Sequence, residues 1–154
     1  MGQTKFRTRF LAILTLVVAT LISRIPAHPA TNATLTVRII GARNAKGKIR
    51  VALFRSAEGF PGDASKAFRL ENAPIDPQTL SSQMVLADLP AGQYALSVFH
   101  DENLNEKLDK NLMGIPKEGY GASNNPGRKM RAPTFDEACF PHEKYQSLEI
   151  KLIY

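Results

Sequence analysis

Residues 34–53 read TLTVRIIGARNAKGKIRVAL, and this stretch decides the fold class. Apolar and polar residues alternate on both sides of a central turn-like segment, Asn44-Ala45-Lys46-Gly47. Strict alternation is typical of a β-strand with one buried face, and Gly is typical of a tight connection because it accepts a positive φ angle. We therefore predict two strands that are joined by a hairpin and paired antiparallel. Their inward residues are expected to be Leu35, Val37, Ile39, Ile49, Val51 and Leu53.

The same alternation predicts further short strands at residues 79–89, 93–98 and 148–152. Residues 56–78 are rich in Gly, Pro, Asp and Ser, and predict an irregular excursion with a short helical turn near residues 64–69. Short strands separated by turns predict an all-β fold, a single antiparallel β-sandwich of immunoglobulin-like or transthyretin-like type over residues 34–154. One long ordered loop region is expected between the last two groups of strands, from Asp101 to Tyr145.

Residues 1–30 have the anatomy of a cleavable signal peptide. Basic residues precede an apolar run at residues 10–22, which is shorter than the roughly twenty apolar residues that a membrane-spanning helix needs. Small residues follow this run, so cleavage is expected near residues 27–33. We predict a periplasmic or secreted protein with no transmembrane span after cleavage.

The charge of the chain belongs largely to this signal peptide. The formal net charge is +6, and cleavage removes four basic residues and no acid, which leaves +2. The basic isoelectric point is therefore no indication of nucleic-acid binding, and we expect an envelope protein or a glycan as partner. The single cysteine, Cys139, excludes an internal disulfide and is expected to be a small buried apolar residue.

Several motifs resemble the bacterial exported family catalogued as domain of unknown function 2141. The resemblance implies a β-sandwich in an export context, and it implies no activity. The most specific motif is GIPKEGYG at residues 114–121. The others are GARNAKG at residues 41–47, VALF at 51–54, LPAGQY at 89–94, HDEN at 100–103, SNN at 123–125 and PTF at 133–135.

The strongest local chemical signal is the run Asp101-x-Asn103-x-Asn105-x-Lys107-x-Asp109. Oxygen-bearing side chains at positions 1, 3, 5 and 9, with a backbone carbonyl at position 7, follow the ligand spacing of a calcium loop. Glu106 occupies position 6, where a tight turn favours Gly, and Leu112 occupies position 12, where calcium loops carry a bidentate Glu. Weak calcium binding is one interpretation; the other is a turn in which Asp and Asn side chains cap backbone amides.

The Gly-punctuated loop at residues 114–127 offers a second candidate site. Its side chains Glu118, Tyr120, Asn124 and Asn125 are candidates for contacts to a carbohydrate or a peptide. His100, His142 and Cys139 are the candidates for catalysis, but they have no recognisable catalytic spacing. We therefore predict a non-enzymatic exported module that binds or scaffolds, with a small periplasmic hydrolase as the alternative.

Overall fold

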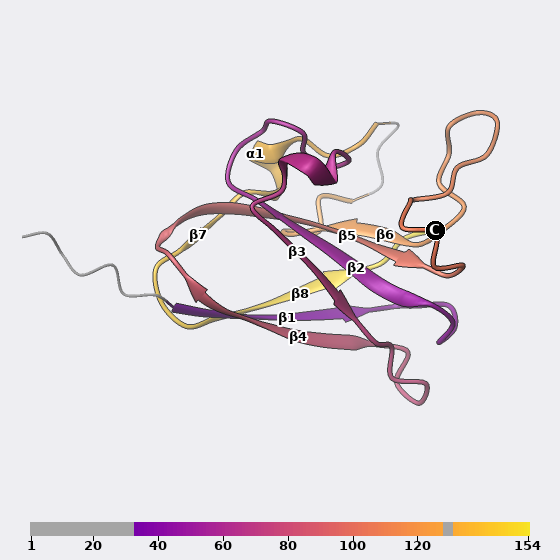
Figure 1. The fold of residues 1–154 in the computed structure, drawn as a ribbon, viewed down its shortest axis with the longest axis horizontal. Helices are drawn as coiled ribbons and strands as arrows, with labels where there is room; N and C mark the ends of the chain where they lie inside the picture. The colour runs from indigo at the N-terminus through magenta and orange to yellow at the C-terminus, as the bar shows by residue number, and fades with distance from the viewer. Residues whose placement is uncertain (1–32, 128–130) are drawn as a thin grey trace, which may run out of the picture.

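The computed structural model describes residues 33–127 and 131–154, which form two β-sheets packed face to face (Figure 1). The predicted signal peptide at residues 1–30 lies outside the described residues. The long strands are β1 (Ala33–Ile40), β2 (Lys48–Phe54), β4 (Ser82–Leu89), β5 (Gly92–Asp101) and β8 (Gln146–Lys151). The shorter elements are a 3-10 helix (Ala64–Lys66), β3 (Arg69–Ala73), β6 (Tyr120–Ala122), helix α1 (Phe135–Ala138) and β7 (Phe140–His142).

One sheet has the strand order β4-β1-β8, and the other has the order β3-β2-β5-β6, with β7 pairing onto β5. All pairs are antiparallel except β1 with β8, which run parallel from the Leu35–Gln146 pair to the Ile40–Lys151 pair. The prediction of an all-β sandwich is confirmed. The parallel pair is a departure from a purely antiparallel sandwich.

The predicted pairing of the first two strands is wrong. β1 pairs with β4 and β8, whereas β2 pairs with β3 and β5, so the two strands lie in different sheets. Their apolar faces meet across the interior, where Val37 and Val51 belong to the same buried cluster. Alternation shows which face of a strand is buried, but it carries no information about the neighbouring strand. Residues 41–47 therefore cross from one sheet to the other.

Two regions that were predicted to be irregular contain regular structure. Residues 56–78 include the expected helical turn at Ala64–Lys66, and also β3, which pairs antiparallel with β2. The predicted loop region from Asp101 to Tyr145 contains β6, α1 and β7. These elements have three or four residues each, which is too short for any period to be recognised in the sequence. No helix among the described residues has the length and apolar character that a membrane span requires.

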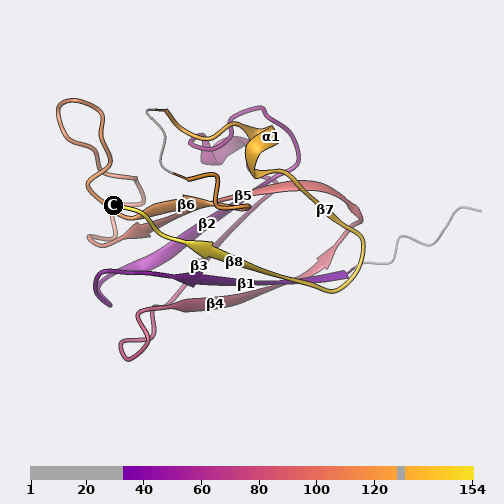
Figure 2. The same ribbon diagram turned by 180° about the vertical axis from the view of Figure 1, so that it is seen from behind.

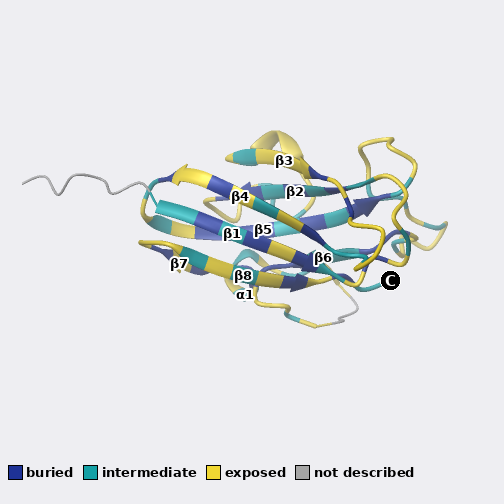
Figure 3. Cartoon of the chain, turned by 90° about the horizontal axis from the view of Figure 1, so that it is seen from below, coloured by how far each residue is buried: buried dark blue, intermediate teal, exposed yellow. Residues whose placement is uncertain are grey.

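The core lies between the two sheets, and buried and exposed residues alternate along the strands (Figure 3). Tyr94 on β5 is fully buried, and its hydroxyl donates to the carbonyl of Pro90 at 2.7 Å. This bond between a strand tyrosine and the preceding turn is a feature of immunoglobulin-like sandwiches. It fixes the start of β5, the strand whose other end carries the polar residues described next.

Three segments gather where β5 ends, as the two opposite views show (Figures 1 and 2). They are the crossover at residues 41–47, the loop at residues 102–119 and the C-terminal residues 152–154. Backbone hydrogen bonds join the loop to β5, from His100 N to Gly119 O at 2.8 Å, and the C-terminal residues to β6, from Tyr120 N to Ile153 O at 2.9 Å. We refer to these three segments together as the loop end.

Candidate functional site

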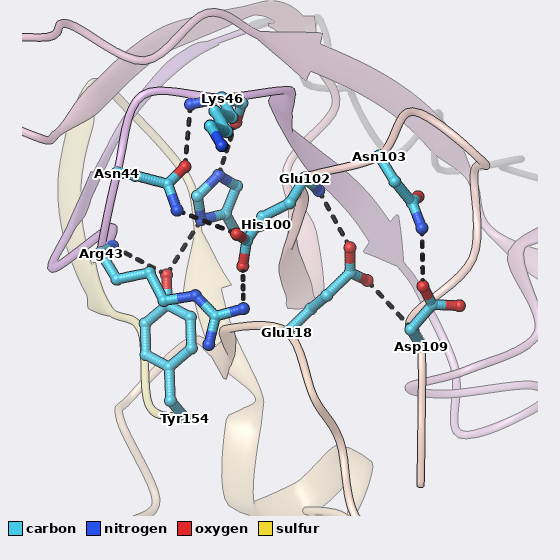
Figure 4. Close-up of polar contacts among 9 residues, drawn as sticks. All are labelled: Arg43, Asn44, Lys46, His100, Glu102, Asn103, Asp109, Glu118 and Tyr154. Carbon is cyan, nitrogen blue, oxygen red and sulfur yellow. Dashed lines mark hydrogen bonds and ion pairs between the residues drawn. The ribbon is translucent and has the colours of Figure 1, made fainter.

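His100, near the end of β5, is completely buried beneath the loop end. Its Nε2 lies 2.7 Å from the carbonyl oxygen of Lys46, which can only accept, so Nε2 carries the proton. Its Nδ1 lies 2.9 Å from the hydroxyl of Tyr154, which donates to it (Figure 4). Both ring nitrogens are therefore engaged in joining β5 to the crossover and to the C-terminus.

The Tyr154 hydroxyl also accepts the backbone N–H of Arg43 at 2.9 Å. Burial raises the pKa of Tyr154, the hydrogen bond from Arg43 opposes that effect, and the negative charge of Glu102 adds to it. The hydroxyl consequently stays protonated and remains a donor to His100 at neutral pH. Nothing in the sequence singled out Tyr154, because a terminal tyrosine after a strand carries no motif.

Glu118, predicted to be a binding residue, is buried with 4% of its surface exposed. Its Oε1 accepts the backbone N–H of Glu102 at 2.9 Å, and its Oε2 accepts that of Asp109 at 3.0 Å (Figure 4). A carboxylate that accepts two backbone amides from one loop holds that loop in a single shape. Glu118 therefore acts as an internal brace of the loop 102–119.

Asp101, the first residue of the predicted calcium loop, is also completely buried. Its Oδ1 accepts the backbone N–H of Asn105 and its Oδ2 that of Glu106, both at 3.0 Å. Leu104 and Glu106 have φ angles of 62° and 66°. The backbone at position 6 is thus left-handed, a conformation that favours Gly, although the residue there is Glu106.

The other predicted calcium ligands lie together around Asp109. Asn103 Nδ2 donates to Asp109 Oδ2 at 2.7 Å, and Asn105 Nδ2 donates to Asp109 Oδ1 at 3.0 Å. The Asn105 side chain in turn accepts the backbone N–H of Lys107 at 2.8 Å. Within residues 33–127 and 131–154, no three His, Cys, Asp or Glu side chains are grouped so that they could hold a metal. The carboxylates and amides of this loop contact one another and the backbone.

Arginines pair with the remaining acidic residues of the loop end. Arg50 Nη1 lies 2.8 Å from Glu106 Oε1 and 3.8 Å from Asp101 Oδ2. Arg43 lies 2.6 Å from Glu102, whose other oxygen accepts from Asn44 at 2.9 Å.

Two of these carboxyl groups have pKa values below their usual range. Burial alone would raise the pKa of Glu102, but the hydrogen bonds from Asn44 and Arg43 and the charge of Arg43 lower it. The hydrogen bond from Arg50 and its charge lower the pKa of Glu106. Both groups are therefore charged at neutral pH, and the loop end contains several ion pairs.

The four residues predicted to bind a carbohydrate or a peptide do not form one site. Asn124 Nδ2 donates to the carbonyl of Cys139 at 2.8 Å, and Asn125 bridges Glu149 O at 2.9 Å and Lys151 N at 2.8 Å. Both asparagines therefore tie the segment after β6 to its neighbours.

Tyr120 and Asn125 do share a cavity of about 160 Å³, in which neither Glu118 nor Asn124 is among the described lining residues. Sites for small molecules usually enclose about 300–1,000 Å³. The remaining described residues that line this cavity are Gly121, Ala122, Pro126, Gly127, Pro133, Lys151 and Ile153.

The candidates for catalysis lie apart. β7 carries His142 and pairs with Gly92–Tyr94, at the start of β5, whereas His100 lies near the opposite end of that strand. Cys139 is partly exposed rather than buried, and its Sγ lies 3.3 Å from Gln93 Oε1. Burial and the charge of Asp136 raise the pKa of the thiol, which disfavours the nucleophilic thiolate. His100 thus lies far along β5 from both Cys139 and His142.

Residues 37–149 match the family model described as an uncharacterized protein conserved in bacteria, domain of unknown function 2141. No curated protein and no solved structure matches the chain. The chain therefore belongs to this bacterial family, as the motifs at residues 41–47 and 114–121 indicated.

Proposed function

We propose that this member of the family is an exported, non-enzymatic module that binds a component of the cell envelope through its loop end. The export part of the proposal rests on the signal-peptide anatomy of residues 1–30. The binding part rests on one observation: an ordered turn at residues 111–115 holds three apolar side chains in solvent.

The order of this turn comes from Asn111. Its backbone N–H donates to Ile115 O at 2.8 Å, and its carbonyl accepts from Gly114 N at 2.9 Å. Its side-chain Oδ1 accepts the backbone N–H groups of Met113 and Ile115 at 2.9 and 3.0 Å. An Asn that hydrogen-bonds to the following residues fixes a turn locally, without help from a hydrophobic core.

The three apolar side chains of this turn are exposed. The exposed fraction is 108% for Leu112, 80% for Met113 and 54% for Ile115. Exposed apolar side chains grouped on one ordered segment mark an interaction surface, because their contact with water is unfavourable unless a partner covers them. We refer to residues 110–117 as the tip.

The polar groups beneath the tip support binding rather than catalysis. Asp101 and Glu118 are buried and accept backbone N–H groups of the loop. His100 is buried as well, and its ring nitrogens are engaged by Lys46 and Tyr154. General acid–base catalysis requires a side chain within reach of a substrate proton. Asp101 and Glu118 instead position the loop that carries the tip, and His100 fixes the crossover and the C-terminal residue beside it.

Replacement of the three apolar tip residues tests this proposal. Leu112→Ser, Met113→Ser and Ile115→Ser together should reduce the fraction of the protein that sediments with isolated cell envelopes. The matched control is Leu70→Ser with Val85→Ser, which removes two exposed apolar residues on β3 and β4. Equal sedimentation of the parent, the tip variant and the control would contradict the proposal.

Calcium binding by the Asp101–Asp109 turn is a second candidate function. The contacts of Asn103 and Asn105 with Asp109 favour it, because they bring the side chains of positions 3, 5 and 9 together. The oxygens of Asp101, Asn103, Asn105 and Asp109, with the carbonyl of Lys107, would hold the ion. Binding there would stiffen the base of the loop that carries the tip.

A further inference from the structure

We propose that the tip is an interfacial anchor for an anionic lipid surface. Leu112, Met113 and Ile115 enter the boundary between headgroups and acyl chains, and Lys110 and Lys117 contact the anionic headgroups. This inference rests on the proposed function and names the partner of the same surface.

The shape of the tip favours a lipid surface. In two opposite views the loop 102–119 stands out from both sheets (Figures 1 and 2). A protruding apolar turn needs a groove in a protein partner, whereas a bilayer accepts it without a preformed site. Amphipathic helices bind membranes with their apolar face buried about 5–10 Å into the headgroup–acyl boundary, and we place the apolar side chains of the tip in the same layer.

The charges of the tip favour an anionic surface. Residues 110–117 contain two lysines and no acidic residue. Within residues 33–127 and 131–154, the ion pairs do not involve Lys110 or Lys117. Both ammonium groups are therefore available to phosphate groups.

The acidic residues nearest the tip are held in place by hydrogen bonds or an ion pair. The Asp109 carboxylate accepts the amide groups of Asn103 and Asn105, and Glu118 is buried on two backbone N–H groups. Glu106 is paired with Arg50. The tip itself consequently presents two positive charges and no negative charge to a partner.

The two lysines also lie where they can reach the headgroups when the apolar turn is inserted. Lys110 pairs with Pro116 in an isolated bridge, and Lys117 N donates to Asp109 O at 2.8 Å. Their backbones thus stand on opposite sides of the base of the small hairpin, with the apolar turn beyond them. Long lysine side chains at the edge of an inserted apolar segment extend to the headgroup layer.

A tryptophan reporter tests the proposal directly, because the chain has no tryptophan. The variants Leu112→Trp and Val85→Trp each place one fluorophore at an exposed site, on the tip and on β4 respectively. Phosphatidylcholine vesicles with and without phosphatidylglycerol are added to the purified protein. We expect a blue shift of the Leu112→Trp emission with the anionic vesicles, and no shift for Val85→Trp.

Replacement of the two lysines provides a second test. In the Leu112→Trp background, Lys110→Gln with Lys117→Gln should weaken binding to the anionic vesicles about thirtyfold, because each lysine near such a surface contributes about 1 kcal/mol. Lys66→Gln with Lys144→Gln, which changes two exposed lysines outside the loop end, should leave binding unchanged.

Three outcomes would overturn the proposal. The first is an emission wavelength of Leu112→Trp that no vesicle changes, and the second is an equal emission shift for Leu112→Trp and Val85→Trp. The third is self-association of the parent that the tip variant abolishes, which would identify a second copy of the chain as the partner. Loss of envelope sedimentation in the tip variant without any vesicle binding would leave the proposed function standing and remove the lipid assignment alone.

Discussion

The carboxylate of Glu118 lies 3.0 Å from the backbone nitrogen of Asp109 and accepts its N–H. The other oxygen of the same carboxylate accepts the N–H of Glu102. One buried side chain thereby connects both sides of the loop that presents the tip. The brace holds the base of the loop, and the hydrogen bonds of Asn111 fix the turn at its end, where Leu112 and Met113 are exposed.

Replacement of the brace should loosen the loop and destabilise the domain. Glu118→Gln keeps one acceptor oxygen but turns an amide NH₂ toward a backbone donor, so one buried N–H loses its partner. We expect a loss of about 1–3 kcal/mol in the free energy of unfolding, measured by urea denaturation. The control Glu149→Gln alters an exposed pair with Arg38 and should cost less than about 1 kcal/mol. Equal effects would show that Glu118 is no brace.

Gly47 should not tolerate a side chain. Its φ angle is 68°, and a Cβ atom there would collide with the backbone carbonyl of Asp101. Gly47→Ala should therefore reduce stability by at least about 2 kcal/mol. Gly62→Ala is the control, because no atom lies within 4 Å of its added Cβ. A Gly47→Ala protein with the melting temperature of the Gly62→Ala protein would show that the crossover does not pack closely on β5.

Stability in acid should depend on Glu102. Its pKa is lowered in the folded state, so its stabilising contribution is complete above the ordinary value of 4.5 and is lost as the pH falls through the lowered pKa. The melting temperature of Glu102→Gln should lie below that of the parent at neutral pH and approach it in acid. Exposed Glu143, outside the loop end, provides the control Glu143→Gln, which should follow the parent. Parallel curves for Glu102→Gln and the parent would contradict the assignment.

Calcium should raise the melting temperature if the Asp101–Asp109 turn binds it. For a dissociation constant near 10⁻⁴ M, millimolar calcium adds about 1.4 kcal/mol. Glu106→Gly should show a calcium shift of the same size, because position 6 is already left-handed at φ 66° in the folded chain. Magnesium should act less strongly. If neither calcium nor a chelator changes the melting temperature of the parent or of Glu106→Gly, residues 101–109 form a capped turn and no calcium site.

The sequence predicts correctly those strands in which the alternation of residues agrees with the burial of one strand face. Val37, Val51 and Leu96 alternate with polar or small neighbours, and each is buried. The capped turn from Asp101 was also among the interpretations, because Asx turns depend only on residues close in the chain. The pairing of β1 was not accessible, since its partners β4 and β8 are chosen by long-range packing.

The candidate site was harder to predict for the same reason. Glu118 looks like a surface carboxylate in the sequence, and only the fold brings it beneath Glu102 and Asp109. Leu112 and Met113 are of apolar residue types that usually lie in a protein core. Their exposure follows from the local hydrogen bonds of Asn111. Apolarity in a sequence predicts burial, but it cannot distinguish burial in the core from burial against a partner.

Site-specific photo-crosslinking in living bacteria tests most directly whether the tip is the binding surface. A photoreactive residue replaces Met113 in one protein and Val85 in the other, both exposed in the structure. We predict that irradiation produces adducts with envelope components from position 113 and none from position 85. Adducts from position 85 alone, or the same adducts in equal yield from both positions, would contradict the account.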